Sequence, residues 1–240
     1  MVNTDALARV TVQTPGGRVN YYGEAVIDGV PGSAAPVLID FQNIAGSSCG
    51  ALFPTGNLTD TVDGIQVTCI DNGMPVVLMD AEALGVSGAE SPAELEANKH
   101  LKERIEAIRM DIGPRMKLGD VANQTVPKMC LLSAANRGGV VNTRTFIPHR
   151  VHDAIGVLGS VSVATACAIP GTVAAKYVQA RPHDAPLGIE HPTGVFTVAM
   201  TLSLTNTPTE PSIARSALLR TARLLMRGDV LIPTNNITTE

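Results

Sequence analysis

Residues 159–173 read GSVSVATACAIPGTV, and almost every position carries a small or apolar side chain. A stretch of this kind is buried on all sides, and its Val and Thr residues suit either a strand or a helix. Its length favours a helix. We therefore expect a buried central helix with the other elements packed around it.

Most of the remaining segments predict strands. Residues 8–13 alternate, and they lie across a turn at 15–17 from an extended segment at 19–27, so the two predict a hairpin. Further strands are expected at 37–41, 66–70, 75–79 and 126–132. Strands combined with one enclosed apolar helix predict an α+β domain in which a curved mixed sheet is wrapped around the helix.

Two further helices are expected. Ser91, Pro92 and Glu94 form the sequence pattern of a capping box, and apolar residues follow at helical spacing from Leu101 to Ile112. A second amphipathic helix is predicted at about 212–226, before a terminal strand at 230–233. On that helix Arg220, Arg223 and Arg227 would form a solvated basic stripe, to which we assign no site role.

Composition narrows the class of protein. The chain of 240 residues is 45% apolar and 17% charged, as in soluble globular proteins. A net charge of −4 and the absence of Trp argue against a nucleic-acid partner. No run of eighteen apolar residues and no signal peptide is present, so we expect neither a membrane partner nor secretion, and we predict a cytoplasmic protein. The four cysteines lack C-x-x-C spacing, which predicts reduced thiols.

The loop at 46–57 (GSSCGALFPTGN) is the first candidate site. Its glycines allow backbone N–H groups to approach an anion closely, and Ser47 and Ser48 add hydroxyls. Cys49 is a weak candidate for a nucleophile or proton carrier, since a free Cys is more often a small buried apolar residue. An ordinary structural turn is the alternative for the whole loop.

The second candidate is the cationic segment 144–152 (RTFIPHRVH), which precedes the expected central helix. Arg150 and His152, together with the helix start at Gly159 and Ser160, would form a carboxylate site, because a helix N-terminus attracts anions. Surface ion pairs and structural histidines are an equally weighted alternative. Pro148 and the lack of an acidic partner in register argue against a metal site.

Two turns complete the set. His191, Thr193 and Gly194 lie in the segment 190–194 (EHPTG) and could line a pocket, and Asn72 could hold a substrate or merely close a turn.

Five blocks resemble the methylaconitate cis-trans isomerase family in order and spacing: 27–36, 46–57, 126–128, 190–194 and 220–223. The resemblance covers nearly the whole chain and is greatest to the branch of 4-oxalomesaconate tautomerases. It implies the diaminopimelate-epimerase-like fold, in which two similar domains hold the active site between them. It also implies cofactor-independent proton transfer that shifts a double bond, or interconverts keto and enol forms, in an unsaturated tricarboxylate.

The resemblance further implies a domain division. Residues 1–36 would be the last strands of an otherwise missing first domain, and 37–240 the second domain, with a last strand at about 229–233 that could pair with the first. The family's usual base, in a Ser-Lys-Gly segment, and its Asn-Cys-Gly-Asn segment belong to that first domain and are absent here. The catalytic residues are therefore left unassigned. Two functions are therefore considered: an isomerase and a non-catalytic carboxylate-binding module. The possible protein partner is a second copy of the chain or a complementing first domain.

Overall fold

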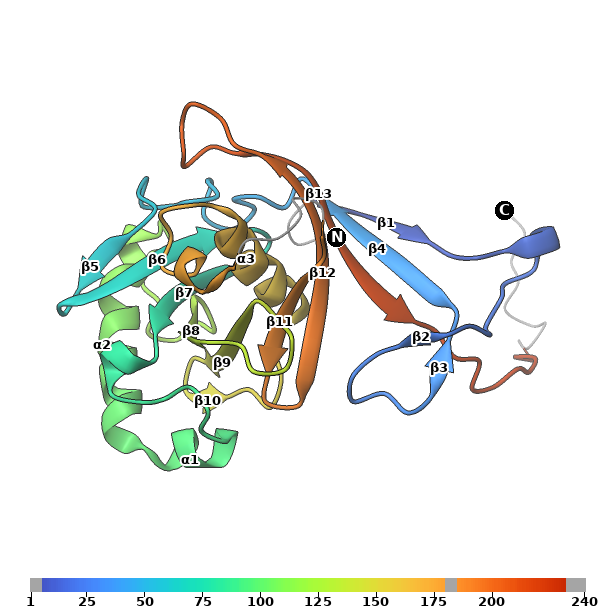
Figure 1. Ribbon diagram of the computed structural model, residues 1–240, viewed down its shortest axis with the longest axis horizontal. Coiled ribbons are helices and arrows are strands. Elements are labelled where there is room, and N and C mark those ends of the chain that lie inside the picture. Colours follow the sequence, from blue (N-terminus) through green and yellow to red (C-terminus); the bar gives the residue numbers. More distant parts are fainter. Residues whose placement is uncertain (1–5, 180–184, 232–240) are drawn as a thin grey trace.

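A strongly curved eleven-stranded sheet encloses helix α3 (Val157–Ala168) in the computed structural model (Figure 1), which describes residues 6–179 and 185–231. The predicted α+β class and the buried central helix are confirmed. The helix ends at Ala168 because Ile169 precedes Pro170, and a residue before proline disfavours helical backbone.

The sheet combines strands from both ends of the described chain. Its order is β1 (Leu7–Thr11), β4 (Pro36–Gln42), β13 (Ser212–Thr221), β12 (Gly194–Ser203), β11 (Leu187–His191), β9 (Val141–Ile147), β8 (Lys128–Ser133), β7 (Pro75–Asp80), β6 (Ile65–Asp71) and β5 (Asp60–Val62), and β10 (Arg150–Val151) pairs with β9. Neighbours are antiparallel except β7 with β8 and β9 with β11. A separate small sheet joins β2 (Ala25–Val26) to β3 (Ser33–Ala34).

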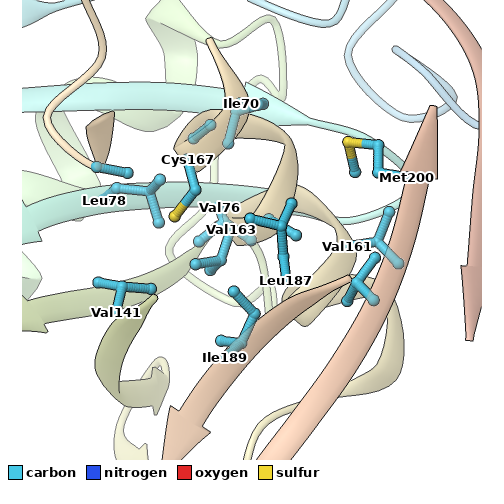
Figure 2. Packing of buried hydrophobic residues seen from close by; sticks show 14 of the residues in the cluster. Ile70, Val76, Leu78, Val141, Val161, Val163, Cys167, Leu187, Ile189 and Met200 are labelled. Carbon is cyan, nitrogen blue, oxygen red and sulfur yellow. The ribbon is translucent and has the colours of Figure 1, made fainter. Parts of the chain in front are cut away.

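The inner face of the sheet and α3 share one apolar core, which Figure 2 shows from close by. Val161 and Val163 of α3 lie among side chains from β6, β7, β9, β11 and β12. The labelled strand residues are Ile70, Val76, Leu78, Val141, Leu187, Ile189 and Met200. Small and β-branched residues let the helix approach strands on all sides, which explains the apolar pattern of its sequence.

A second core covers the outer face of β5 to β9. Helix α1 (Pro92–Ala97) begins with the predicted capping box at Ser91, and α2 (Lys99–Arg115) buries Leu101, Ile105, Ile108 and Ile112 against this face. Asn98 separates the two helices because its backbone leaves the helical region while its side chain caps Leu101. The strands β6 to β9 are therefore covered on both faces, whereas β12 alternates buried and more exposed residues.

Three predictions about secondary structure are wrong in whole or in part. Segment 212–226 is not a helix: β13 takes residues 212–221, paired with β12 on one side and β4 on the other, so the proposed basic stripe on a helix does not exist. Helix propensities differ by less than about 1 kcal/mol per residue, so pairing on both edges outweighs the helical composition of this segment. Of the terminal strand, residues 230 and 231 are not in a strand and 232–233 lie outside the described residues.

The prediction of an N-terminal hairpin is also wrong. Strand β1 pairs with β4, and of residues 19–27 only Ala25 and Val26 form a strand, with β3. The turn at 15–17 is a short 3-10 helix, and two others lie at Glu82–Leu84 and Ala175–Tyr177. In Figure 1 β1, β2 and β3 extend away from α3, together with the last part of β13.

Candidate functional site

The start of α3 presents unused backbone donors. Gly156 precedes the helix and supplies no side-chain cap, and the first helical bond that follows runs from Ser160 N to Gly156 O at 2.8 Å. The N–H groups of residues 157–159 therefore have no partner within the helix. Gly156 and Val157 are exposed, so this end of the helix is accessible from solvent. This end of α3 can attract an anion.

A pocket of about 210 Å³ lies at this helix start. It contains the predicted residues His152 and Gly159, and it also contains Lys128, which sequence reasoning did not select. Burial lowers the pKa of Lys128, whose Nζ donates to Thr125 O at 2.5 Å. The rest of the wall is mostly apolar: Met74, Val76, Cys130, Thr145, Ile147, Ile155, Gly156, Val157, Leu158 and Val163.

His152 is held as a neutral hydrogen-bond donor. Its Nδ1 accepts the N–H of Ala154 at 2.9 Å, so the proton of the neutral ring is on Nε2. Burial lowers the pKa of His152, and the charge of Lys128 lowers it further, while Asp153 acts in the opposite direction. A neutral imidazole here can donate from Nε2 without adding a full charge.

A second pocket of about 470 Å³ adjoins the first, because Ile155 lines both. The predicted residues His191 and Thr193 lie in it. His191 Nδ1 faces Thr193 N at 3.3 Å and Thr193 Oγ1 at 3.2 Å. Burial lowers the pKa of His191, with Asp28 opposing this effect and the charges of Arg137 and Arg144 adding to it.

Asp28 and Gly194 fit together at the edge of this pocket. Asp28 Oδ2 accepts the N–H of Val195 at 2.7 Å, and a Cβ at Gly194 would lie 2.4 Å from Asp28 Cβ. Gly194 therefore admits Asp28, and the structure gives it a packing role beside the pocket.

Glu190 organises the loop next to His191. Its carboxylate is buried and accepts the N–H groups of Asn136, Arg137 and Gly139 at 2.6 to 2.9 Å. Three backbone donors on one carboxylate fix the loop at 136–139, which carries Arg137. Sequence reasoning named Glu190 only as part of a turn.

The loop at 46–57 already binds a carboxylate of the protein itself. Ser48 N and Cys49 N both donate to Asp71 Oδ2 at 2.8 Å, so these donors are not open to a substrate. Cys49 is buried, and burial together with the charge of Asp71 raises its pKa to about 12. A buried thiol with a raised pKa is a poor nucleophile, so Cys49 remains only a weak catalytic candidate.

Ile44, just before this loop, lies near the start of α3. A Cβ at Gly73, in the turn between β6 and β7, would lie 3.2 Å from both Ile44 and Leu158, so the three segments meet there. Ser47 Oγ is buried without a hydrogen-bond partner in the described structure, as are Asp71 Oδ1 and Asn72 Oδ1.

Three other predicted residues have structural contacts. Asn72 Nδ2 donates to Thr165 Oγ1 and Ser216 Oγ, which joins α3 to β13, although the residue also borders a cavity. Ser160 is buried and its Oγ donates to Val157 O at 2.7 Å. Arg150 is exposed on β10 and lines neither pocket at the start of α3.

Within residues 6–179 and 185–231, no cluster of His, Cys, Asp and Glu could hold a metal ion, and no helix is long and apolar enough to span a membrane. The structure thus brings His152, Gly159, His191 and Thr193 to one end of α3. It adds Lys128, Asp28, Phe196 and Arg220, the last of which sequence reasoning had placed on a helix.

Comparison with known proteins shows the family of this chain. A family model described as PrpF protein matches residues 1–233. The chain is 54% identical over 233 residues to a 4-oxalomesaconate tautomerase of Pseudomonas putida, covering 97% of this chain and 63% of that protein. It is 51% identical over 234 residues to a (4E)-oxalomesaconate Delta-isomerase of a Novosphingobium species, covering 97% and 64%.

A solved structure of a methylitaconate-delta-isomerase superposes with a TM-score of 0.84 at 24% identity, over 94% of this chain and 63% of that one. This likeness shows the fold. The chain spans less than two thirds of the length of each of these three relatives.

Proposed function

Because the chain belongs to the PrpF protein family, we propose that it acts in the isomerisation of an unsaturated tricarboxylate such as 4-oxalomesaconate, without a cofactor. The observation that carries the proposal is the polar end of α3, where open backbone N–H groups, Lys128 and two histidines converge. The proposal concerns the 4-oxalomesaconate branch because the relatives at 54% and 51% identity carry that substrate in their names.

The reaction is a proton transfer. A C–H bond next to a carbonyl or carboxylate breaks, its electron pair delocalises over the conjugated system as an enolate, and a new C–H or O–H bond forms elsewhere in the same molecule. We propose that the residues at the start of α3 bind substrate carboxylates and stabilise the enolate. Preorganised hydrogen-bond donors in a partly buried site stabilise the negative charge that develops on the enolate. We assign the base to none of the residues at this site.

The predicted site residues fall into two groups: those that line the two pockets at the start of α3 and those that do not. His152, His191, Thr193 and the N–H groups near Gly159 line the two pockets and are proposed as direct contacts. Ser47, Ser48, Asn72, Ser160 and Gly194 are proposed to act by holding the surrounding turns, and Arg150 by long-range charge. Free thiols on all four cysteines fit a reducing compartment, and we place the protein in the cytoplasm.

We also propose that residues 1–36 pack against a further domain of the family, on the same polypeptide or a separate one. All five residues of β1 are exposed, including Leu7 at 60% and Val10 at 50%. β1 is also an edge strand of the sheet, and exposed apolar side chains together with unpaired backbone groups on an edge favour such a contact.

Proton exchange tests the proposed activity. The chain is incubated with 4-oxalomesaconate in D₂O, and ¹H NMR follows deuterium incorporation and migration of the double bond. We expect both above the rate in buffer alone. Absence of exchange with 4-oxalomesaconate, methylaconitate and methylitaconate would refute the isomerase proposal for this chain.

The second candidate is carboxylate binding without turnover. It is favoured by the buried state of all four thiols and by the high pKa of Cys49, since neither provides a reactive thiolate. Saturable binding of a tricarboxylate without deuterium incorporation would select this alternative.

A further inference from the structure

Arg220 is the strongest unassigned feature near the proposed site. It lies near the end of β13, and Leu218 and Ser216, two and four residues earlier, are both buried. Because side chains alternate along a strand, Arg220 shares the face of these residues, which is the inner face toward α3. Its guanidinium carbon lies 3.9 Å from the centre of the Phe196 ring on β12.

The guanidinium has unused hydrogen-bonding capacity. Its Nη1 donates to Leu219 O at 3.0 Å, and no carboxylate of the described residues lies within ion-pair distance of it. Guanidinium has five N–H donors in a planar fork that matches a carboxylate. Stacking on Phe196 fixes the plane of that fork and reduces the entropy lost when an anion binds.

The surroundings place this cation beside the α3 site. Arg220 lines the pocket of about 470 Å³ with His191 and Thr193, and this pocket adjoins the one at the helix start through Ile155. Asp28 also lines the Arg220 pocket, but its Oδ2 is bonded to Val195 N rather than to Arg220. Among the described residues, no carboxylate therefore neutralises this cation.

We propose that Arg220, stacked on Phe196, is a second carboxylate-binding subsite that acts together with the start of α3, so that the site selects ligands with at least two carboxylates. One carboxylate lies at the α3 N–H groups and another accepts the Arg220 fork. This inference rests on the proposed function and refines its substrate class: a monocarboxylate can fill only one of the two subsites.

Binding of tricarballylate, a saturated tricarboxylate, tests this subsite without requiring turnover. The titration is followed in the ¹⁵N-labelled chain through the Arg Nε–Hε signals and the amide signals of residues 157–159. We expect both sets to shift with one dissociation constant. Arg220→Gln weakens binding at least about tenfold, and Arg220→Lys, which keeps the charge but loses the fork, weakens it about threefold or more.

Arg215→Gln is the matched control, because Arg215 is an exposed arginine on the same strand. Its affinity for tricarballylate should stay within about twofold of the wild type, since an exposed charge is screened by solvent. Thermal melting of each variant checks folding, and Arg220→Lys retains the test if Arg220→Gln is unstable.

The outcomes separate the two proposals. If Arg220→Gln and Arg220→Lys bind tricarballylate as the wild type does while the α3 amides still shift, Arg220 is only a packing residue and the proposed function stands. If Arg215→Gln weakens tricarballylate binding as much as Arg220→Gln does, the effect comes from overall positive charge rather than from a specific contact, and the subsite is also overturned. If the wild-type chain shows no binding, both the subsite and the proposed carboxylate site are overturned.

Discussion

Replacing Glu190 with Gln should destabilise the chain by about 3 kcal/mol. The glutamate is 1% exposed and accepts three backbone N–H groups, two on Oε1 and one on Oε2. In the best arrangement the Gln oxygen keeps the pair at the Oε1 position as neutral hydrogen bonds, each weaker by about 1 kcal/mol. Its –NH₂ group then faces Asn136 N–H, so that donor is left buried and unpaired at a cost of about 1 kcal/mol or more.

Urea unfolding followed by far-UV circular dichroism measures this loss, because the chain has no Trp for fluorescence. Glu210→Gln is the control, since Glu210 is exposed, and it should change the free energy of unfolding by less than about 0.5 kcal/mol. A Glu190→Gln variant as stable as Glu210→Gln, or more stable than the wild type, would refute the reasoning. In that case the cost of burying the carboxylate would exceed the value of its three hydrogen bonds.

Three further predictions concern turns, thiols and pH. Gly46→Ala should lower the free energy of unfolding by about 3 kcal/mol or more, because Gly46 has φ +71° and a Cβ there would lie 2.5 Å from Ala51 N. Gly50→Ala is the control: Gly50 has φ +79° but open space around it, so the loss should be about 1 kcal/mol. Equal urea midpoints for the two variants would contradict this. Iodoacetamide at pH 8 should leave Cys49 unmodified in the folded chain, since its pKa is raised to about 12, and intact-mass analysis showing rapid labelling at this residue would count against it. The pKa values of His152 and His191 are lowered in the folded chain, so below about pH 6.5 the folded chain binds fewer protons than the unfolded chain. The contribution of these histidines to stability should therefore be full above that pH and fall as the pH drops toward their folded-state pKa values. A double variant with His152→Gln and His191→Gln should lose less stability on acidification, and thermal melts that show the same loss in both proteins would disprove the assignment.

Local sequence patterns predicted those parts of the fold that local physics decides. The capping box at Ser91 depends on neighbouring residues, and the apolar character of 159–173 follows from burial on every side. Both could therefore be recognised without a structure. Segment 212–226 could not, because its Ala, Leu and Arg residues suit a helix, and only pairing with β4 and β12, distant in sequence, makes 212–221 a strand.

The candidate site was predictable to the same extent. His152 and Gly159 lie close together in sequence at a helix start, which local reasoning can detect. Local patterns do not select Arg220, because its segment has the composition of a helix and its contact with Phe196 exists only across β12 and β13. Lys128 lies on β8 and shares its pocket with residues at the start of α3, which are distant in sequence, so no short sequence pattern shows this contact.

The position of β13 between β4 and β12 bears on how the chain acquires its fold. Strands β5 to β8 are each paired with the next strand in sequence, so this half of the sheet can form, together with α2, from contacts at most about 50 positions apart. The other half requires contacts such as Ser216 N with Asp40, which are 176 positions apart. Long-range pairing of this kind slows folding, and until β13 arrives β4 has an unpaired edge open to other chains. During refolding we therefore expect the α2 half to gain protection from hydrogen exchange first, and aggregation to compete until β13 is inserted.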